Sequence, residues 1–261
     1  MRRETKQARI DADSGFVLLT PEESKELRRG LSEAESAQRS AQIYSAVKHR
    51  LEEAVRENGF DETVCDKAEA RDANWRRLGA SLMEAAGPDF AGNVKFTDHG
   101  IDKFVMVCVD GVAVKAGRMA ELMATEIRTS RKRPELTCFP KLLDWSDGMS
   151  TALVEAVERT FDDAACRAMF GLDLVNMYLE ICGDEDQIYT WGKALPRFGT
   201  ERTRFRRALD SGKGPEWDSL RDLRTFCRTN LNGILLDVGF HNWGLARRNG
   251  VLVPVVYDYD Y

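Results

Sequence analysis

The stretch Lys103-Phe-Val-Met-Val-Cys-Val109, continued by Asp110-Gly111 and Val112-Ala-Val-Lys115, decides how the chain builds a sheet. Two runs rich in β-branched residues flank an Asp-Gly pair, which is the strongest short-range signal for a two-residue hairpin turn. We therefore expect two antiparallel strands joined at Asp110-Gly111, with Lys115 near the end of the second strand.

Residues on the C-terminal side of this hairpin extend the same small domain. Residues 116–131 have a helical pattern that carries Glu121 and Glu126, and residues 139–143 and 149–154 are typical of two further strands. The pattern predicts a small antiparallel sheet with one helix packed on it.

Two helices are expected on the N-terminal side of the hairpin. Ser32-Glu-Ala-Glu35 can form a capping box before an apolar stripe that ends at Asn58-Gly59, and a second helix over residues 66–86 should stop at Gly87-Pro88. These helices read as an N-terminal extension of the sheet domain.

The remaining chain returns to helical patterns and closes with a hairpin. Helices are expected over residues 162–170, 172–181 and 220–231, and Asn249-Gly250 is a favoured turn between two short strands. The polar stretch between the last two helices contains a basic cluster, for which we favour a solvated helical face over a surface for an acidic partner. Its members are Arg202, Arg204, Arg206 and Arg207.

Composition bounds the class of protein. The chain has 261 residues, of which 43% are hydrophobic and 31% charged, so it can bury a core. A net charge of -5 gives no overall attraction to nucleic acid or to anionic membrane, and no apolar run is long enough to cross a bilayer. The six cysteines form no Cys-x-x-Cys pair, so neither a zinc cage nor a disulfide framework is indicated. We expect a cytoplasmic protein with no secretory signal.

The C-terminal stretch holds the residues best suited to chemistry. Asp237, Asn242 and Asp258 stand on loops at the ends of the two closing strands. A carboxylate and an amide oxygen can hold Mg²⁺, which prefers oxygen ligands, while a second carboxylate orients a nucleophile.

This ordered set resembles the protein-kinase-like superfamily, in which an Asp-x-x-x-x-Asn loop precedes a hairpin and a metal-binding Asp. Val112-Ala-Val-Lys115 is similar to the Val-Ala-Ile-Lys motif of the family's third strand. The resemblance spans residues 97–261, and compact phage-encoded serine/threonine protein kinases are similar in having a minimal large lobe.

The resemblance implies an α+β, two-lobed minimal protein-kinase-like fold. Residues 1–90 would be the N-terminal helical extension, residues 91–158 a small lobe with a β-sheet and one helix, and residues 159–261 a reduced helical large lobe. The chain departs from the family in having only Gly100 in the phosphate-covering loop and Leu235-Leu236 in place of the His-Arg before Asp237.

The resemblance also implies roles for individual residues. Lys115 would contact the α- and β-phosphates of ATP and pair with Glu126, with Glu121 as the alternative partner. The other implied roles are adenine contacts at Ala113 and at the backbone of the hinge residues Glu155 and Val157, a gatekeeper at Val154, a phosphate loop at Gly100, catalysis at Asp237, and Mg²⁺ ligands at Asn242 and at Asp258 or Asp260.

The function implied is transfer of the γ-phosphate of Mg-ATP to a protein hydroxyl by a minimal serine/threonine protein kinase, in the host cytoplasm if phage-encoded. A small-molecule phosphotransferase of the aminoglycoside-kinase type is one alternative. A pseudokinase that binds and inhibits another protein is a second. The expected partner is therefore a protein substrate or a host protein, with no nucleic acid and no membrane.

Overall fold

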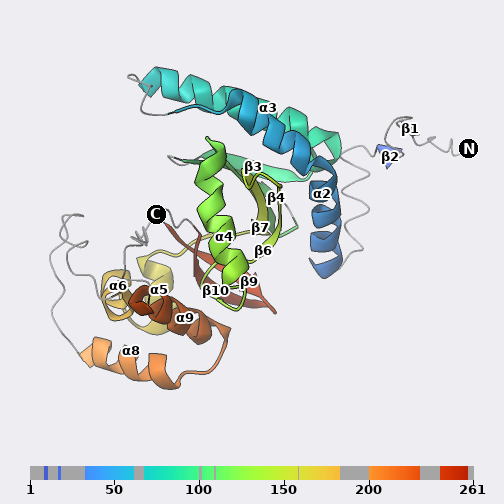
Figure 1. The fold of residues 1–261 in the computed structure, drawn as a ribbon. Coiled ribbons are helices and arrows are strands. Elements are labelled where there is room, and N and C mark those ends of the chain that lie inside the picture. The colour runs from blue at the N-terminus through green and yellow to red at the C-terminus, as the bar shows by residue number, and fades with distance from the viewer. Residues whose placement is uncertain are drawn as a thin grey trace, which may run out of the picture. The chain divides into compact units, whose positions relative to one another are not determined.

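A computed structural model describes residues 9–10, 17–18, 33–61, 68–99, 102–108, 110–157, 159–182, 200–229 and 242–257. The chain forms two compact units, of which unit 1 comprises residues 1–127 and 142–154, and unit 2 comprises residues 128–141 and 155–261 (Figure 1). Helices and antiparallel strands occur in the same chain, which confirms the expected α+β class.

Unit 1 is built on a five-stranded sheet of order β3-β4-β5-β7-β6. Its strands are β3 (Val94–His99), β4 (Lys103–Cys108), β5 (Val112–Gly117), β6 (Leu142–Trp145) and β7 (Thr151–Glu155). The pairs β3/β4, β4/β5 and β6/β7 are antiparallel. A separate short pair, β1 (Arg9–Ile10) and β2 (Val17–Leu18), lies near the N-terminus.

The hairpin between β4 and β5 is confirmed, but its turn differs from the expected one. Three residues separate Cys108 from Val112, so the prediction of a two-residue turn at Asp110-Gly111 was wrong. Gly111 has φ of 80°. A glycine with positive φ at the end of a three-residue loop is a favoured hairpin geometry, and the same Asp-Gly signal serves both loop lengths.

Helices α2 (Glu33–Asn58) and α3 (Ala68–Ala91) pack on one face of this sheet. A Cβ at Gly79 would lie 2.7 Å from the ring of Phe104, so the missing side chain lets α3 approach β4 closely. The helices and the sheet therefore share one hydrophobic core, so the described helices of the N-terminal extension expected over residues 1–90 pack as part of unit 1. The expected stop at Gly87-Pro88 is a kink, with φ of 73° at Gly87, after which the helix resumes.

The segment between β5 and β6 begins its helix later than the sequence pattern indicated. A 3₁₀ turn, η2 (Ala120–Met123), leads into α4 (Ala124–Lys132), whereas the helix was expected from Ala116. Pairing of Gly117 with Lys103 continues β5 to that point. Strand pairing thus overrides the helical propensity of these residues.

In its described residues, unit 2 contains four whole helices, the C-terminal part of α4 and a three-stranded sheet of order β10-β9-β8. The elements are β8 (Arg159–Thr160), α5 (Asp163–Phe170), α6 (Leu174–Cys182), α8 (Thr200–Ser211), α9 (Pro215–Thr229), β9 (Trp243–Arg248) and β10 (Val251–Val256). Asn249 and Gly250 have φ of 52° and 79°, so the expected Asn-Gly hairpin turn is confirmed. Phe161, Tyr178 and Trp243 lie in the core of this unit.

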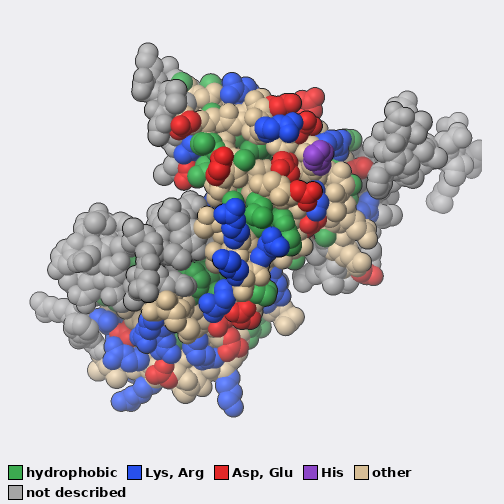
Figure 2. All heavy atoms as spheres, viewed as in Figure 1, with side chains coloured by type: hydrophobic (Ala, Val, Ile, Leu, Met, Phe, Trp, Pro, Cys, Tyr) green, Lys and Arg blue, Asp and Glu red, His purple; other side chains and the backbone are tan. Residues whose placement is uncertain are grey.

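The expected basic cluster lies on α8 and is only partly a solvated face. Basic side chains gather over α8 in Figure 2, and Arg204 and Arg207 are exposed. Arg202, by contrast, is 8% exposed and donates from Nε to Oε1 of Glu180 on α6 at 2.7 Å. Arg206 donates to the same carboxylate at 2.8 Å. Two of these arginines therefore join α8 to α6.

Candidate functional site

Lys115 lies near the end of β5, on the sheet face opposite the core of unit 1. Its neighbours Val114 and Ala116 belong to that core, and side chains alternate between the two faces of a strand. Ala113 therefore shares the face of Lys115. Lys115 is 5% exposed, so its long stem is covered and its ammonium group has a defined position.

Glu126, in the first turn of α4, receives the ammonium group of Lys115. Nζ of Lys115 lies 2.5 Å from Oε1 and 2.7 Å from Oε2, and the carboxylate is itself 5% exposed. Glu121 lies exposed on η2. Of the two partners expected for Lys115, the structure therefore selects Glu126, and this ion pair is confirmed.

Lys103 also contacts Glu126, and the sequence reasoning missed this residue. It begins β4, is 3% exposed, and places Nζ 3.1 Å from Oε2 of Glu126. The signal was present in the alternation, since Lys103 occupies the same strand face as Val105 and Val107. A lysine that is buried on a face otherwise carrying valines indicates a buried charge partner. We call Lys103, Lys115 and Glu126 the lysine–glutamate cluster.

The chemistry of this cluster suits an anionic ligand. An ammonium group carries three donors on a flexible stem, so it can hold a carboxylate and a further acceptor together. Buried ion pairs add little net stability over apolar residues of similar size, so stability alone is a weak reason for this cluster. Phosphate oxygens are suitable acceptors, because an ammonium group forms charge-assisted hydrogen bonds with them.

The sheet face around Lys115 otherwise carries small apolar side chains. Ala113 precedes it on β5, and Ala152 and Val154 lie on the face of β7 opposite the core residue Leu153. All three are buried. These side chains are apolar, as contact with a base ring requires, and contact of Ala113 with adenine stays a prediction.

The proposed hinge residue Glu155 has a second role in the structure. Its backbone N–H donates to the carbonyl of Lys141 at 2.9 Å, and its carboxylate accepts from the backbone N–H of Lys141 at 3.2 Å. Val157 is half-buried two residues later. Contact of either backbone with adenine is not tested by these bonds.

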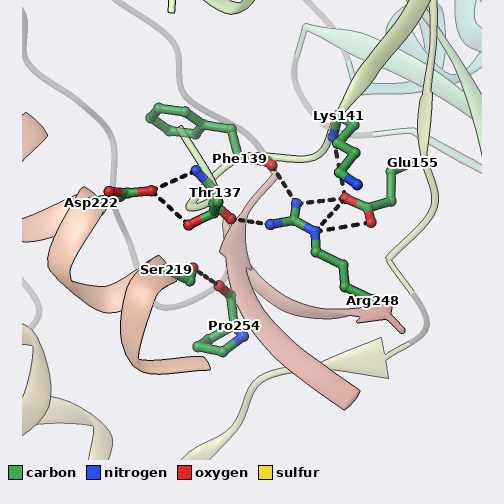
Figure 3. A network of polar contacts seen from close by, with 8 residues as sticks. All are labelled: Thr137, Phe139, Lys141, Glu155, Ser219, Asp222, Arg248 and Pro254. Atoms are coloured by element: carbon green, nitrogen blue, oxygen red, sulfur yellow. Dashed lines mark hydrogen bonds and ion pairs between the residues drawn. The ribbon is translucent and has the colours of Figure 1, made fainter. Parts of the chain in front are cut away.

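The carboxylate of Glu155 binds Arg248 at the end of β9, within unit 2. Figure 3 shows the guanidinium between Glu155 and two backbone carbonyls. Nε lies 3.0 Å from Oε1, and Nη2 lies 2.6 Å from Oε2 and 2.7 Å from the carbonyl oxygen of Phe139. Nη1 donates to the carbonyl of Thr137. No sequence pattern singled out this arginine.

The same region is tied to α9. Asp222 accepts from the backbone N–H and the hydroxyl of Thr137 at 2.8 and 2.6 Å, and the hydroxyl of Ser219 donates to the carbonyl of Pro254 (Figure 3). These bonds fix the segment before β6 and the strand β10 to one helix. We interpret these hydrogen bonds as structural support rather than as part of a reactive site.

Asn242, an expected metal ligand, lies directly before β9 in unit 2 and is 6% exposed. Its carbonyl accepts from the backbone N–H of Tyr257 at 2.9 Å, so the open end of the hairpin joins this residue to the end of β10. Asp258 directly follows Tyr257 in sequence.

The other expected site residues lie outside the described residues. These are Gly100, Asp237, Asp258 and Asp260. Within the described part of the chain, no group of three or more His, Cys, Asp and Glu side chains is placed to hold a metal ion. The structure thus brings together Lys115 and Glu126 and leaves the catalytic and metal assignments as predictions.

None of the helices among the described residues is long and apolar enough to span a membrane. Comparison with known proteins found no matching family model, no matching curated protein and no matching solved structure.

Proposed function

We propose that this chain is an ATP-dependent phosphotransferase of the protein-kinase-like type, which transfers the γ-phosphate of Mg-ATP to a protein hydroxyl. The observation that carries the proposal is the buried ion pair between Lys115 on β5 and Glu126 on α4. A strand, a lysine near its end, and a glutamate in the next helix form the phosphate-holding part of such enzymes.

The pair would act by positioning. The carboxylate of Glu126 holds the ammonium group of Lys115 at one place on the sheet, so the lysine meets the phosphates without losing further side-chain freedom. Its positive charge stabilises the negative charge of the transferring phosphoryl group. The apolar face that includes Ala113 would receive the adenine ring.

The C-terminal hairpin would supply the rest of the site. Asn242 and Asp258 are the proposed Mg²⁺ ligands, and the bond between Asn242 and Tyr257 supports this pairing because Asp258 is the next residue. The ion would neutralise phosphate charge when bound. Asp237 would orient the substrate hydroxyl or accept its proton.

The finer fold assignment belongs to the same proposal. A sheet-containing unit with a helix after its third main strand, and a second unit dominated by helices, support a small lobe and a truncated large lobe. Helices α2 and α3 share a core with the sheet, so the proposed small lobe would carry two helices that the family pattern does not contain.

The test is transfer of label from γ-phosphate-labelled ATP with Mg²⁺, by the purified chain alone and with cell extract. We expect labelled protein from the wild type, and at least a roughly hundredfold loss in Lys115→Ala and in Asp237→Ala. The control is Lys95→Ala, which removes an exposed lysine from β3 of the same sheet.

Each other result selects a different conclusion. Labelling by Lys115→Ala at the wild-type rate contradicts the proposal. A labelled metabolite without labelled protein identifies the small-molecule phosphotransferase instead. Failure to bind Mg-ATP in calorimetry, together with tight binding of a host protein that survives Asp237→Ala, identifies the pseudokinase.

A further inference from the structure

Two neighbouring strands, β4 and β5, each bring one buried lysine to the same carboxylate oxygen of Glu126. Nζ of Lys115 lies 2.7 Å and Nζ of Lys103 lies 3.1 Å from Oε2 of Glu126. The strand register explains the meeting, because Lys103 pairs with Gly117 and Lys115 pairs with Val105. The lysines are thus diagonal neighbours on one face of the sheet.

Two ammonium groups at one carboxylate repel each other, and this repulsion is stronger in a buried place than in water. Any added negative charge between them lowers the repulsion, whatever other contacts each lysine makes. A di- or triphosphate brings several negative oxygens to one place. The lysine–glutamate cluster is therefore electrostatically suited to a polyphosphate rather than to a neutral or singly charged ligand.

The two lysines hold Glu126 differently. Lys115 contacts both carboxylate oxygens, at 2.5 and 2.7 Å, whereas the ion pair of Lys103 is the longer contact at 3.1 Å. Packing does not demand a lysine here, because the next positions on the same face of β4 are Val105 and Val107.

We propose that Lys103 is a second phosphate-binding residue, and that Lys103 and Lys115 together hold the nucleotide phosphates with Glu126 as their shared anchor. The inference rests on the proposed function, because it concerns the same nucleotide site. It goes further by placing a binding residue at the start of β4 that the family motif does not contain.

The test compares how tightly the purified chain binds adenosine, AMP, ADP and ATP with Mg²⁺, by calorimetry, in the wild type, Lys103→Met, Lys103→Gln and Lys95→Met. A phosphate-binding lysine contributes only when phosphates are present. We expect both Lys103 variants to weaken ATP and ADP binding about tenfold or more while adenosine binding changes less than about twofold. Lys95→Met should bind all four ligands as the wild type does.

The outcomes separate this inference from the proposed function. If the wild type binds ATP and the Lys103 variants retain its ATP-to-adenosine preference, Lys103 is a structural residue and the inference is wrong while the proposed function stands. If the wild type binds none of the four ligands, the proposed function itself fails. Lys103→Gln keeps a polar group beside Glu126, so it serves where Lys103→Met does not fold, and Lys103→Arg should restore ATP binding at least in part because it keeps the charge.

Discussion

Unit 1 and unit 2 each contain a strand that delivers a buried cation to a carboxylate, and the two cations are held in different ways. Arg248 on β9 donates to both oxygens of Glu155 and to the carbonyls of Thr137 and Phe139, through a planar group with fixed donor directions. Lys115 on β5 meets Glu126 through one ammonium group that turns freely about its bond.

This difference indicates two uses of the same kind of interaction. A guanidinium that bonds to two backbone carbonyls fixes the path of the chain, so its loss should appear in stability. An ammonium group that shares a carboxylate with Lys103 suits an exchangeable acceptor, so its loss should appear mainly in ligand binding. The predictions below separate these two uses, beginning with the largest expected effect.

Arg248→Met should destabilise unit 2 strongly. The substitution leaves the half-buried carboxylate of Glu155 and the carbonyls of Thr137 and Phe139 without these bonds, and breaking a buried ion pair costs about 3–5 kcal/mol. The measurement is the free energy of unfolding from urea denaturation. The control is Arg247→Met, an exposed neighbour on the same strand, which should cost less than about 1 kcal/mol. Equal losses of unfolding free energy in the two variants would contradict the structural role proposed for Arg248.

Glu126→Gln should have a smaller effect on stability. The amide keeps one oxygen that the lysines can share but loses the charge, and a hydrogen bond to a charged group contributes about 1.5–3 kcal/mol. The matched control is Glu121→Gln on the exposed surface of η2, which should stay within about 0.5 kcal/mol of the wild type. Thermal or urea unfolding measures both. A loss at Glu126 as large as that of Arg248→Met would show the lysine–glutamate cluster to be mainly structural.

The smallest predicted effect is a change in acid stability at Glu180, which joins α6 to α8 in unit 2. Burial alone would raise the pKa of this carboxyl, but hydrogen bonds from Arg206 and Arg202 outweigh it and hold the pKa below its ordinary value. Because the folded-state pKa is depressed, the contribution is fully present above the ordinary pKa of a glutamate and is lost as the pH falls through the lowered folded-state pKa.

Glu180→Gln should therefore weaken the acid dependence of stability between those values. The measurement is the urea midpoint at a series of pH values, with Glu201→Gln, an exposed carboxyl on α8, as the control. An acid limb as steep in Glu180→Gln as in the wild type would contradict the prediction. No such dependence is expected from the uncharged carbonyl partners of Arg248.

The two hairpins, one in each unit, could be predicted from local patterns. The Asp-Gly and Asn-Gly signals predicted both hairpins, because a turn residue that adopts positive φ is a property of a few neighbouring residues. The sequence favoured Glu126 but left Glu121 open as the alternative, because the choice depends on where β5 ends and α4 begins. The 3₁₀ turn at Ala120–Met123 determined where α4 begins and therefore which glutamate faces Lys115.

The sequence by itself determined the α+β class, the two hairpins and a lysine placed near the end of a strand with a helical glutamate after it. Only the tertiary structure decided that α2 and α3 share a core with the sheet, that Arg248 binds Glu155, and that Lys103 meets the carboxylate of Glu126. The physical reason is that turn and strand preferences depend on adjacent residues, whereas core packing and buried ion pairs join residues brought together by strand register and helix packing.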